Sequence, residues 1–285
     1  MEIIKGVAEM TALAAIWRKE CKQVALVPTM GFLHEGHLAL AKAARPENEI
    51  VVMSIFVNPI QFGVGEDYAV YPRDLERDAQ LAEAAGVDYI FNPAAGDMYG
   101  EGFQTTVKVA GLTEGLCGKS RPTHFQGVTT VLSKLFNIVQ PVHAYFGQKD
   151  AQQVAVVEKM VQDLNMLSRS ILIFVRVPIV READGLALSS RNIYLSVDAR
   201  KQALVLSQSI ALAEKLFQNG ERDAEAIKQA IIKHIQTAPM AEIDYVEIVD
   251  AQTIQPKARL EGISLLAMAV RFEKTRLIDN ILLQA

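Results

Sequence analysis

Two short runs of apolar residues, separated by a helix-like segment, constrain the fold of this chain more than any other feature. Residues 24–27 and 50–57 are rich in β-strand formers and show no alternation of polar and apolar side chains. Strands have this composition when both of their faces are buried, as in a parallel sheet covered by helices. Between the two runs, residues 37–44 carry leucine and alanine at helical spacing, and Pro46 stops the helix. The sequence therefore predicts a βαβ unit.

The same alternation continues along the first part of the chain. Further helices are expected at residues 75–85, closed by Gly86, at 128–139, before Pro141, and at 152–164. Further strands are expected at residues 89–91, 144–146 and 171–177. Strands that alternate with helices build a doubly wound, Rossmann-like parallel sheet, so the predicted fold class is α/β. Ligands of such sheets bind at the carboxyl ends of the strands.

The pattern changes after Asn192. Two long helical patterns, at residues 197–217 and 224–237, precede two strand candidates, at 245–249 and 265–270, and an arginine-rich tail with Arg271 and Arg276. A chain of 285 residues is long enough for about two domains. We therefore predict a Rossmann-like domain at residues 1–178 and a smaller α+β C-terminal domain at residues 179–285.

Composition argues against several classes of partner. The chain has 29 lysine and arginine residues against 33 aspartate and glutamate residues, a formal net charge of −4, and no basic run, which argues against nucleic acid. No apolar stretch approaches the roughly 18 residues of a membrane span, and the N-terminus lacks the pattern of a signal peptide, so no membrane partner is expected. Cys21 and Cys117 are predicted to be free thiols in a reducing compartment, which favours the cytoplasm.

A histidine motif follows the first predicted strand. His34, Gly36 and His37 stand at the opening of the first predicted helix, just after a turn that contains Gly31. A helix N-terminus presents N–H groups and a partial positive charge, and imidazoles there donate to phosphate oxygens. Two alternatives are a pair of exposed surface histidines and a zinc site, for which no third ligand is evident. The arrangement favours a phosphate site.

This motif and five further segments together resemble one family. The pattern His-x-Gly-His after a first strand is typical of the nucleotidyltransferase superfamily, and the run from Pro28 to His37 is similar to that of the pantothenate synthetase (pantoate–β-alanine ligase) family. The other segments that agree, in the family's order, are Phe56-Val57-Asn58-Pro59-Ile60-Gln61-Phe62, Tyr71-Pro72-Arg73, Ser120-Arg121-Pro122-Thr123-His124-Phe125, Gly147-Gln148-Lys149-Asp150 with Gln152-Gln153, and Leu186-Ala187-Leu188-Ser189-Ser190-Arg191-Asn192. The resemblance covers essentially the whole chain.

What the resemblance implies is an AMP-forming ligase that joins carbon to nitrogen. The family condenses (R)-pantoate with β-alanine to pantothenate, on the route to coenzyme A, through an enzyme-bound pantoyl adenylate, and it consumes ATP and releases pyrophosphate and AMP. The implied catalytic residues are His34 and His37, which would stabilise charge on the phosphoryl oxygens, and Lys149 and Arg191, which would bind the β and γ phosphates. The implied ATP-binding residues are Met30, Gly31, Phe32, Leu33, His34, Glu35, Gly36, His37, Gly147, Gln148, Lys149, Asp150, Arg176, Leu188, Ser189, Ser190 and Arg191.

The resemblance also implies how the other reactants are held. Mg²⁺ is expected with ATP, with Asp150 as a candidate ligand of the metal or the ribose, and no tightly bound prosthetic group is expected. Gln61 and Gln153 are the implied pantoate ligands, because an amide offers both donors and acceptors and leaves a carboxylate nucleophilic. Asn58 would either orient Gln61 or contact β-alanine. In the second step, His37 is the candidate that accepts or returns a proton.

Some segments allow more than one interpretation. Residues 63–68 are glycine-rich and charged, and predict either a mobile flap over the pocket or a plain surface loop. His124 is either structural or a second polar group of the site, whereas His143 and His234 are expected to be structural or exposed. Residues 167–176 look longer than the family's usual approach to the last strand, with Arg176 where a small residue is more familiar. Thr123 stands where glycine is usual.

Two other functions are open on the sequence alone. A nucleotidyltransferase that keeps the nucleotide on its product would share the histidine motif but usually lacks a second domain. A catalytically silent scaffold would be favoured by the loss of His34, Lys149 or Arg191, all of which are present. The resemblance further implies a homodimer formed by the N-terminal half. We also expect the C-terminal domain to act as a lid that brings residues 189–191 over the triphosphate.

Overall fold

The structure is a computed structural model that describes residues 1–166 and 173–285. By their internal contacts the residues divide into two compact units. The first comprises Met1–Val109, Arg121–Gln148 and Val156–Pro178, and the second comprises Ala110–Ser120, Lys149–Ala155 and Ile179–Ala285. Two short segments before Ile179 therefore group with the second unit, and the domain limits 1–178 and 179–285 stay a prediction.

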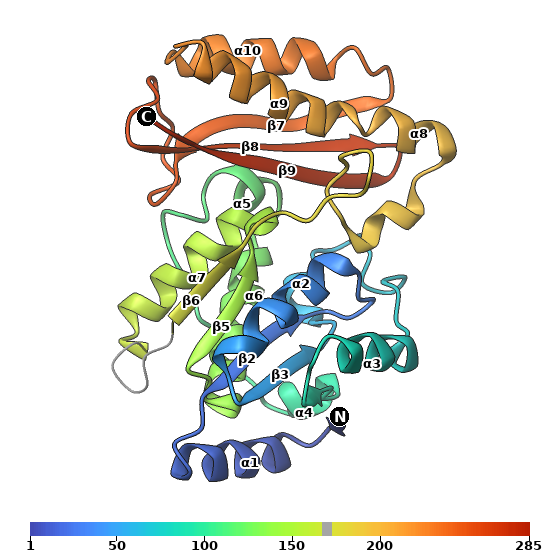
Figure 1. The fold of residues 1–285 in the computed structure, drawn as a ribbon, viewed down its shortest axis with the longest axis vertical. Helices are drawn as coiled ribbons and strands as arrows, with labels where there is room; N and C mark the ends of the chain where they lie inside the picture. Colours follow the sequence, from blue (N-terminus) through green and yellow to red (C-terminus); the bar gives the residue numbers. More distant parts are fainter. Residues whose placement is uncertain (167–172) are drawn as a thin grey trace. The chain divides into compact units, whose positions relative to one another are not determined.

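The first unit is built on a six-stranded parallel sheet with the order β1-β4-β3-β2-β5-β6, and Figure 1 labels β2, β3, β5 and β6. The strands are β1 (Glu2–Ile4), β2 (Val24–Thr29), β3 (Ile50–Ile55), β4 (Tyr89–Phe91), β5 (His143–Gly147) and β6 (Ile173–Val177). The prediction of a doubly wound, Rossmann-like sheet is confirmed. β1 was not predicted, because three residues are too few to show a pattern. Residues 171 and 172 of the last predicted strand, and residues 167–172 of the unusual segment before it, lie outside the described residues.

Helices connect these strands and bury them. They are α1 (Val7–Lys19), α2 (Glu35–Ala44), α3 (Leu75–Ala84), α4 (Ala95–Met98), α6 (His124–Val139) and α7 (Ala151–Asp163), with the 3₁₀ helices η1 (Arg45–Glu47), η2 (Pro59–Gln61) and η3 (Gln148–Asp150). Leu38 of α2 and Ala82 of α3 share one core cluster with Val27 and Met53 of the sheet. Both β2 and β3 are buried along nearly their whole length, which explains why their sequences carry no polar face. In the described ranges no helix is long and apolar enough to cross a membrane.

The direction of strand addition reverses between β2 and β5. From β2 the chain adds β3 and then β4 on one side, whereas β5 and β6 extend the sheet on the other side. At such a switch point the loops after the two strands diverge and leave a crevice at their carboxyl ends. The loop after Thr29 carries the histidine motif and the loop after Gly147 carries another predicted site segment. Two of the predicted segments therefore follow neighbouring strands at the ligand-binding edge.

The second unit is built on a three-stranded antiparallel sheet of β7 (Ala241–Asp250), β8 (Ile263–Phe272) and β9 (Thr275–Gln284). The helices α9 (Val205–Gln218) and α10 (Ala224–Ile235) pack on one face, where Ile210, Ile231 and Met268 belong to one core cluster (Figure 1). On the other face, Leu116 of α5 (Leu116–Ser120) packs with Leu265. The unit is completed by η5 (Ser190–Tyr194) and α8 (Val197–Gln202).

Two elements of the second unit differ from their sequence predictions. The helix predicted at residues 197–217 is two helices, because the chain turns between α8 and α9 at Ala203 and Leu204. Both residues keep near-helical angles, with φ/ψ of −62°/−18° and −60°/−21°, so the apolar periodicity continues through the turn without a glycine or proline. The predicted arginine-rich tail is instead the hairpin of β8 and β9, in which Arg271 and Arg276 face each other across the strands. The charged residues beside the tight turn concealed the strand pattern that follows.

The difference in burial between two isoleucines of the second unit predicts that the same substitution lowers the free energy of unfolding by different amounts. Ile231 is fully buried, whereas the side chain of Ile263 at the start of β8 is 44% exposed. Ile231→Ala should lower the free energy of unfolding by about 2–5 kcal/mol, because it leaves a cavity. Ile263→Ala should lower it by about 1 kcal/mol or less. Urea unfolding followed by circular dichroism measures both changes, and equal losses would contradict the packing.

Candidate active site

The loop after β2 turns sharply before it reaches the histidines. Gly31 has a φ of 84° and Phe32 a φ of 49°, so two successive residues are left-handed. A Cβ on Gly31 would lie 2.8 Å from the Cγ2 of Ile55 and 3.1 Å from the Oδ2 of Asp78, so a larger residue would displace these side chains. Thr29 closes the turn, because its Oγ1 accepts the Gly31 N–H at 3.2 Å and donates to the Ser54 carbonyl at 2.7 Å.

A buried carboxylate holds this turn in place. Asp78 of α3 is 1% exposed, and its two oxygens accept the backbone N–H groups of Phe32 and Leu33 at 2.6 and 2.7 Å. Burial raises the pKa of Asp78 above its ordinary value, and the two N–H donors and Arg77 oppose that rise. The guanidinium of Arg77 also lies over the Phe32 ring, 5.0 Å from its centroid. Asp78 was not predicted as a site residue, because its only signal in the sequence is an acidic residue on the buried face of a helix.

The two histidines of the motif cap α2 together. His34 is the N-cap residue, and its Nδ1 accepts the N–H of Gly36 at 3.1 Å. The Nδ1 of His37 accepts the N–H of His34 at 3.4 Å, and the two rings stack with centroids 4.0 Å apart. Because each Nδ1 is an acceptor, a neutral ring carries its proton on Nε2. The structure thus places two imidazole N–H donors at one helix N-terminus.

Further observations at the histidine motif concern its two alternative interpretations, a pair of exposed surface histidines and a zinc site. The side chain of Glu35 is exposed on α2 and pairs with Lys42 at 3.1 Å, so it belongs to the helix surface. The stacking and reciprocal capping of His34 and His37 differ from a pair of independent surface side chains. Over residues 1–166 and 173–285, no three His, Cys, Asp or Glu side chains are grouped to hold a metal ion, so the structure adds no third ligand to the zinc alternative.

Gln61 is positioned by its neighbours. Asn58 donates from Nδ2 to the Oε1 of Gln61 at 3.0 Å and to the Gly127 carbonyl at 3.1 Å, and its Oδ1 accepts the Tyr99 hydroxyl at 2.7 Å. Burial raises the pKa of Tyr99, so its hydroxyl stays protonated as the donor. The Nε2 of Gln61 donates to the Sδ of Met30 at 2.9 Å. Of the two roles predicted for Asn58, these contacts support the orientation of Gln61.

The helix α6 approaches η2 too closely for any side chain at residue 127. A Cβ on Gly127 would lie 2.5 Å from both the Cα of Gln61 and the carbonyl oxygen of Ile60. At the start of α6, the Nδ1 of His124 lies 3.0 Å from the Gln61 carbonyl oxygen, which supports the structural interpretation of this histidine. Gly127 was not predicted as a site residue, because it lies just before the helix expected at residues 128–139, whereas α6 begins at His124.

An ion pair holds the predicted flap at residues 63–68. Arg121 binds Glu66 through both carboxylate oxygens, at 2.6 and 2.5 Å. Burial favours the neutral acid, but the hydrogen bonds and charge of Arg121 keep the pKa of Glu66 below its ordinary value. The Tyr68 ring packs against Phe62, with centroids 5.4 Å apart, and the guanidinium of Arg73 lies over the Tyr68 ring. These contacts fix one conformation of the segment, and its movement as a flap stays a prediction.

The edge formed by β5 and β6 holds three further predicted residues. Gly147 ends β5 opposite Val177 of β6, and Gln148 follows in η3. Arg176 lies opposite Phe146 in the same pair of strands. Its guanidinium binds the carboxylate of Glu158 on α7, with the Nε at 3.0 Å from Oε1. The side chain of Arg176 is thus engaged within the first unit, and its backbone forms the strand end.

Two further predicted residues belong to the second unit: Lys149, which precedes α7, and Gln153, which lies on α7. The Nζ of Lys149 lies 3.5 Å from the carboxylate of Asp150, and Asn280 of β9 donates to the Lys149 carbonyl at 2.8 Å. Gln153 is half-buried on α7. Its neighbour Gln152 uses both ends of its amide to hold residues 112–117, so it is the structural member of the pair.

The predicted ATP-binding residues 188–191, here called the serine-arginine loop, also lie in the second unit. Ser189 caps η5 by accepting the Arg191 N–H at 3.3 Å, Ser190 is buried, and the Leu188 N–H bonds to the Val180 carbonyl at 3.0 Å. The predicted residues therefore fall into two groups. The first unit holds Met30, Gly31, Phe32, Leu33, His34, Glu35, Gly36, His37, Asn58, Gln61, Gly147, Gln148 and Arg176, and the second holds Lys149, Asp150, Gln153, Leu188, Ser189, Ser190 and Arg191.

A cleft of about 300 Å³ opens at the carboxyl ends of β2, β3 and β4 in the first unit. Met30, Gly31 and Phe32 line it, so the predicted nucleotide loop forms one of its walls. Tyr68 and Arg73 contribute from the predicted flap and the segment after it. The cleft therefore joins the turn held by Asp78 to the flap segment held by Glu66.

Comparison with known proteins identifies the family. A profile described as pantoate-beta-alanine ligase matches residues 2–282. The chain belongs to the pantoate–β-alanine ligase family. It is 54% identical over 284 residues to the pantothenate synthetase of Acetivibrio thermocellus, a match that covers 100% of both chains. This relationship confirms the resemblance inferred from the motifs.

Solved structures of pantoate–β-alanine ligases share the whole fold. The pantothenate synthetase of Thermus thermophilus matches with a TM-score of 0.92 and 46% identity over 99% of each chain. The pantoate-beta-alanine ligase of Francisella tularensis, complexed with β-γ ATP and β-alanine, matches with a TM-score of 0.79 and 31% identity, over 99% of this chain and 97% of that one. Membership of the pantoate–β-alanine ligase family confirms the predicted fold, the predicted ligase class and the predicted reaction. It also decides against a nucleotidyltransferase that keeps the nucleotide on its product.

The contacts of Asp78 predict a local effect of removing its charge. Asp78→Asn turns an amide nitrogen toward one of the two N–H donors, so the free energy of unfolding should fall by about 1–3 kcal/mol. Hydrogen exchange at the Phe32 and Leu33 amides should accelerate relative to the wild type. Asp74→Asn is the matched control, because asparagine still caps α3 in place of Asp74, which accepts the Arg77 N–H at 3.1 Å. Unchanged exchange at residues 32 and 33 in Asp78→Asn would contradict this role.

The ion pair of Glu66 predicts a dependence of stability on pH. Because the pKa of Glu66 is lower in the folded chain than its ordinary value of 4.5, its stabilisation is present above that value and disappears as the pH falls through the folded pKa. The difference in free energy of unfolding between the wild type and Glu66→Gln should therefore be largest near neutral pH and vanish in acid. Denaturant titrations at a series of pH values measure it, and a difference independent of pH would rule out the pair as its source.

Proposed function

We propose that His34 and His37 are the centre of the adenylation site, where the enzyme, which condenses pantoate with β-alanine, forms the pantoyl adenylate. The observation that carries this proposal is the stacked imidazole pair at the N-terminus of α2, next to the switch point of the sheet. In the first step the pantoate carboxylate attacks the α-phosphorus of ATP, and pyrophosphate leaves. Negative charge then grows on the phosphoryl oxygens, where the two Nε2–H donors and the helix N-terminus would stabilise it.

The nucleotide is proposed to lie along the loops that follow β2 and β5. The left-handed turn from Met30 to Leu33 lets a phosphate approach the backbone closely, and Gly147 and Gln148 continue the binding edge at β5. At the end of β6, the guanidinium of Arg176 is bound to Glu158, so this residue would contact adenine through its backbone. In this proposal the side chain of Arg176 stays clear of the adenine, and the end of β6 recognises the base through main-chain groups.

The cations for the β and γ phosphates are proposed to be Lys149 and Arg191. A lysine supplies a point charge and an arginine a planar fork, and both suit a triphosphate. Leu188, Ser189 and Ser190 would complete the loop around it. These residues belong to the second unit, and we propose that residues 179–285 act as the lid that delivers them.

Magnesium is proposed to bind together with ATP. Mg²⁺ in such sites takes phosphate oxygens and waters as ligands, with one or two carboxylates from the protein. Asp150, whose side chain is 46% exposed, offers such a carboxylate beside Lys149. The bound ion would neutralise part of the charge on the β and γ phosphates.

Pantoate is proposed to bind between neutral amides. Asn58 fixes the Oε1 of Gln61, and Met30 accepts from its Nε2, so this amide is held in one orientation for the hydroxyl and carboxylate groups of pantoate. Gln153 would supply the second amide. Neither amide carries charge, so the pantoate carboxylate would keep its nucleophilicity.

In the second step, the amine of β-alanine attacks the adenylate carbonyl and AMP leaves. The attacking amine must be neutral, and His37 is proposed either to accept its proton at Nε2, in the tautomer that has released the contact of Nδ1 with the His34 N–H, or to return a proton from Nε2–H. The relative from Francisella tularensis is complexed with β-γ ATP and β-alanine, which supports the proposal that this chain binds ATP and β-alanine. ATP is thus a substrate, and no tightly bound prosthetic group is part of the proposal.

We also propose that the enzyme is a cytoplasmic homodimer. Cys21 and Cys117 are free thiols, which supports a reducing compartment. The dimer, through the N-terminal half, is supported by the family resemblance.

The histidine pair gives the sharpest test of the mechanism. His37→Ala should lower kcat by about 100- to 1,000-fold, because it removes one donor to the transferring phosphoryl group. The rate is measured as pyrophosphate released in the presence of pantoate, β-alanine and Mg-ATP. His234→Ala, the same substitution on α10, should keep the wild-type rate, and circular dichroism verifies that both variants are folded. A His37→Ala enzyme with near wild-type turnover would remove this residue from the mechanism.

A further inference from the structure

A short two-stranded loop precedes the serine-arginine loop in the second unit. Arg181 and Ala187 form an isolated antiparallel bridge, and Gly185, with a φ of 97°, makes the turn between them. The guanidinium of Arg181 donates to both carboxylate oxygens of Asp279 at 2.7 and 2.9 Å, and to the Gly185 carbonyl at 3.1 Å. Because Asp279 is a buried residue of β9, this loop is fixed to the sheet of the second unit.

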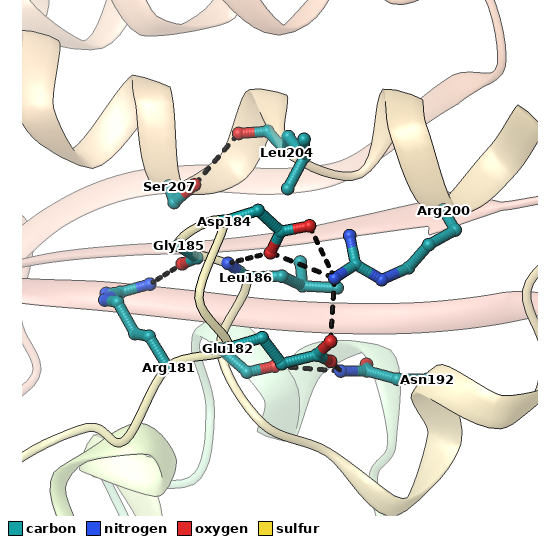
Figure 2. A network of polar contacts seen from close by, with 10 residues as sticks. Arg181, Glu182, Asp184, Gly185, Leu186, Asn192, Arg200, Leu204 and Ser207 are labelled. Carbon is teal, nitrogen blue, oxygen red and sulfur yellow. Dashed lines mark hydrogen bonds and ion pairs between the residues drawn. The ribbon is translucent and has the colours of Figure 1, made fainter.

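Glu182 lies at the centre of a network of side chains in this loop (Figure 2). Its Oε1 accepts the Nδ2 of Asn192 at 2.8 Å, and its Oε2 accepts the Nη2 of Arg200 at 2.8 Å. Arg200 comes from α8 and also binds both carboxylate oxygens of Asp184, at 3.0 and 2.8 Å. The side chains of Glu182 and Arg200 are 32% and 24% exposed, so the pair is partly shielded from water. One carboxylate therefore links η5 to α8.

Asn192 is held in a single orientation by this network. Its Nδ2 donates one hydrogen to Glu182 and the other to the Ala187 carbonyl at 3.1 Å. Its Oδ1 is buried and has no hydrogen-bond partner among the described residues. A buried acceptor without a donor is unfavourable, so the amide depends on the charged acceptor Glu182 to stay in this orientation.

Asn192 connects the network to the serine-arginine loop. It follows Arg191 directly, and its N–H bonds to the Ser189 carbonyl at 3.0 Å. The same turn is closed by the hydroxyl of Ser189, which accepts the Arg191 N–H. The loss of Glu182 would let the side chain of Asn192 rotate. Because the backbone of Asn192 continues directly from Arg191, this rotation would shift the serine-arginine loop.

We propose that Glu182 is a positioning residue that acts through Asn192 to set the conformation of residues 189–191 for the triphosphate of ATP. This inference rests on the proposed role of Arg191 in binding ATP. A carboxylate has the wrong charge to bind a phosphate, and the charge of Glu182 is matched by Arg200. The effect of Glu182 on the nucleotide therefore passes through the amide of Asn192 and the backbone that this amide holds.

The test compares Glu182→Gln and Asn192→Ala with the wild type in the full-length enzyme. The value of kcat/KM for Mg-ATP should fall about 10- to 100-fold in each, because a displaced loop misplaces the phosphate ligands. The KM for β-alanine should stay within about twofold of the wild type. Because both residues act through one contact, the kcat/KM for Mg-ATP of the double variant should be no lower than that of the less active single variant.

Glu247→Gln is the matched control. It breaks a comparable ion pair in the same unit, between Glu247 of β7 and Lys228 of α10 at 3.0 Å, and should leave the KM for ATP unchanged. Thermal unfolding shows how much of each variant is folded, since a loss of folded enzyme lowers kcat without raising the KM for ATP. A wild-type KM for ATP in both Glu182→Gln and Asn192→Ala, or an equal rise in the KM for β-alanine, would overturn the inference.

Arg191→Ala separates this inference from the function on which it rests. A wild-type KM for ATP in Arg191→Ala would overturn the proposed role of the loop itself. A raised KM in Arg191→Ala together with wild-type values in the Glu182 and Asn192 variants would overturn only the positioning role of Glu182. Raised values in all three variants support both.

Discussion

One buried carboxylate sets the geometry on which the proposed adenylation site depends. Asp78 binds the N–H groups of Phe32 and Leu33 just where the chain passes through two left-handed residues. Such a conformation is costly for Phe32, so the turn persists because Asp78 and the close packing of Gly31 both enforce it. Once the turn is fixed, His34 stands as the N-cap of α2, and the cap orients both imidazoles. The proposed catalytic geometry thus originates in α3, a helix without any proposed catalytic residue.

Carboxylates also hold other loops within each unit, there through ion pairs with arginine. Arg121 and Glu66 hold the flap segment of the first unit, and Arg181, bound to Asp279, holds the loop before the serines in the second. Glu182 then orients Asn192 at the end of that loop. Apolar packing builds the sheets and their helices, whereas paired charges fix the loops at which substrates are proposed to bind. This division is expected, because loops have little apolar surface to bury and carry most functional side chains.

The sequence predicted those features that leave a local pattern. Burial on both faces made β2 and β3 uninterrupted apolar runs, and the histidine motif could be recognised because its residues are adjacent. The strand β9 was missed because charged residues at its turn masked the pattern, and the break between α8 and α9 because near-helical angles continue through it. Asp78 and Gly127 were missed because their roles are contacts with residues distant in the chain. The role of Glu182 depends likewise on Asn192 and Arg200, which only the fold brings to it.

The mechanism requires that the site forms an acyl adenylate from pantoate before β-alanine takes part. The most direct measurement is ATP–pyrophosphate exchange by the wild-type enzyme with Mg²⁺, with and without pantoate, and without β-alanine. If the adenylate forms first, exchange appears only with pantoate, and AMP is released once β-alanine is added. Exchange that is absent with pantoate, or that requires β-alanine, would contradict this mechanism.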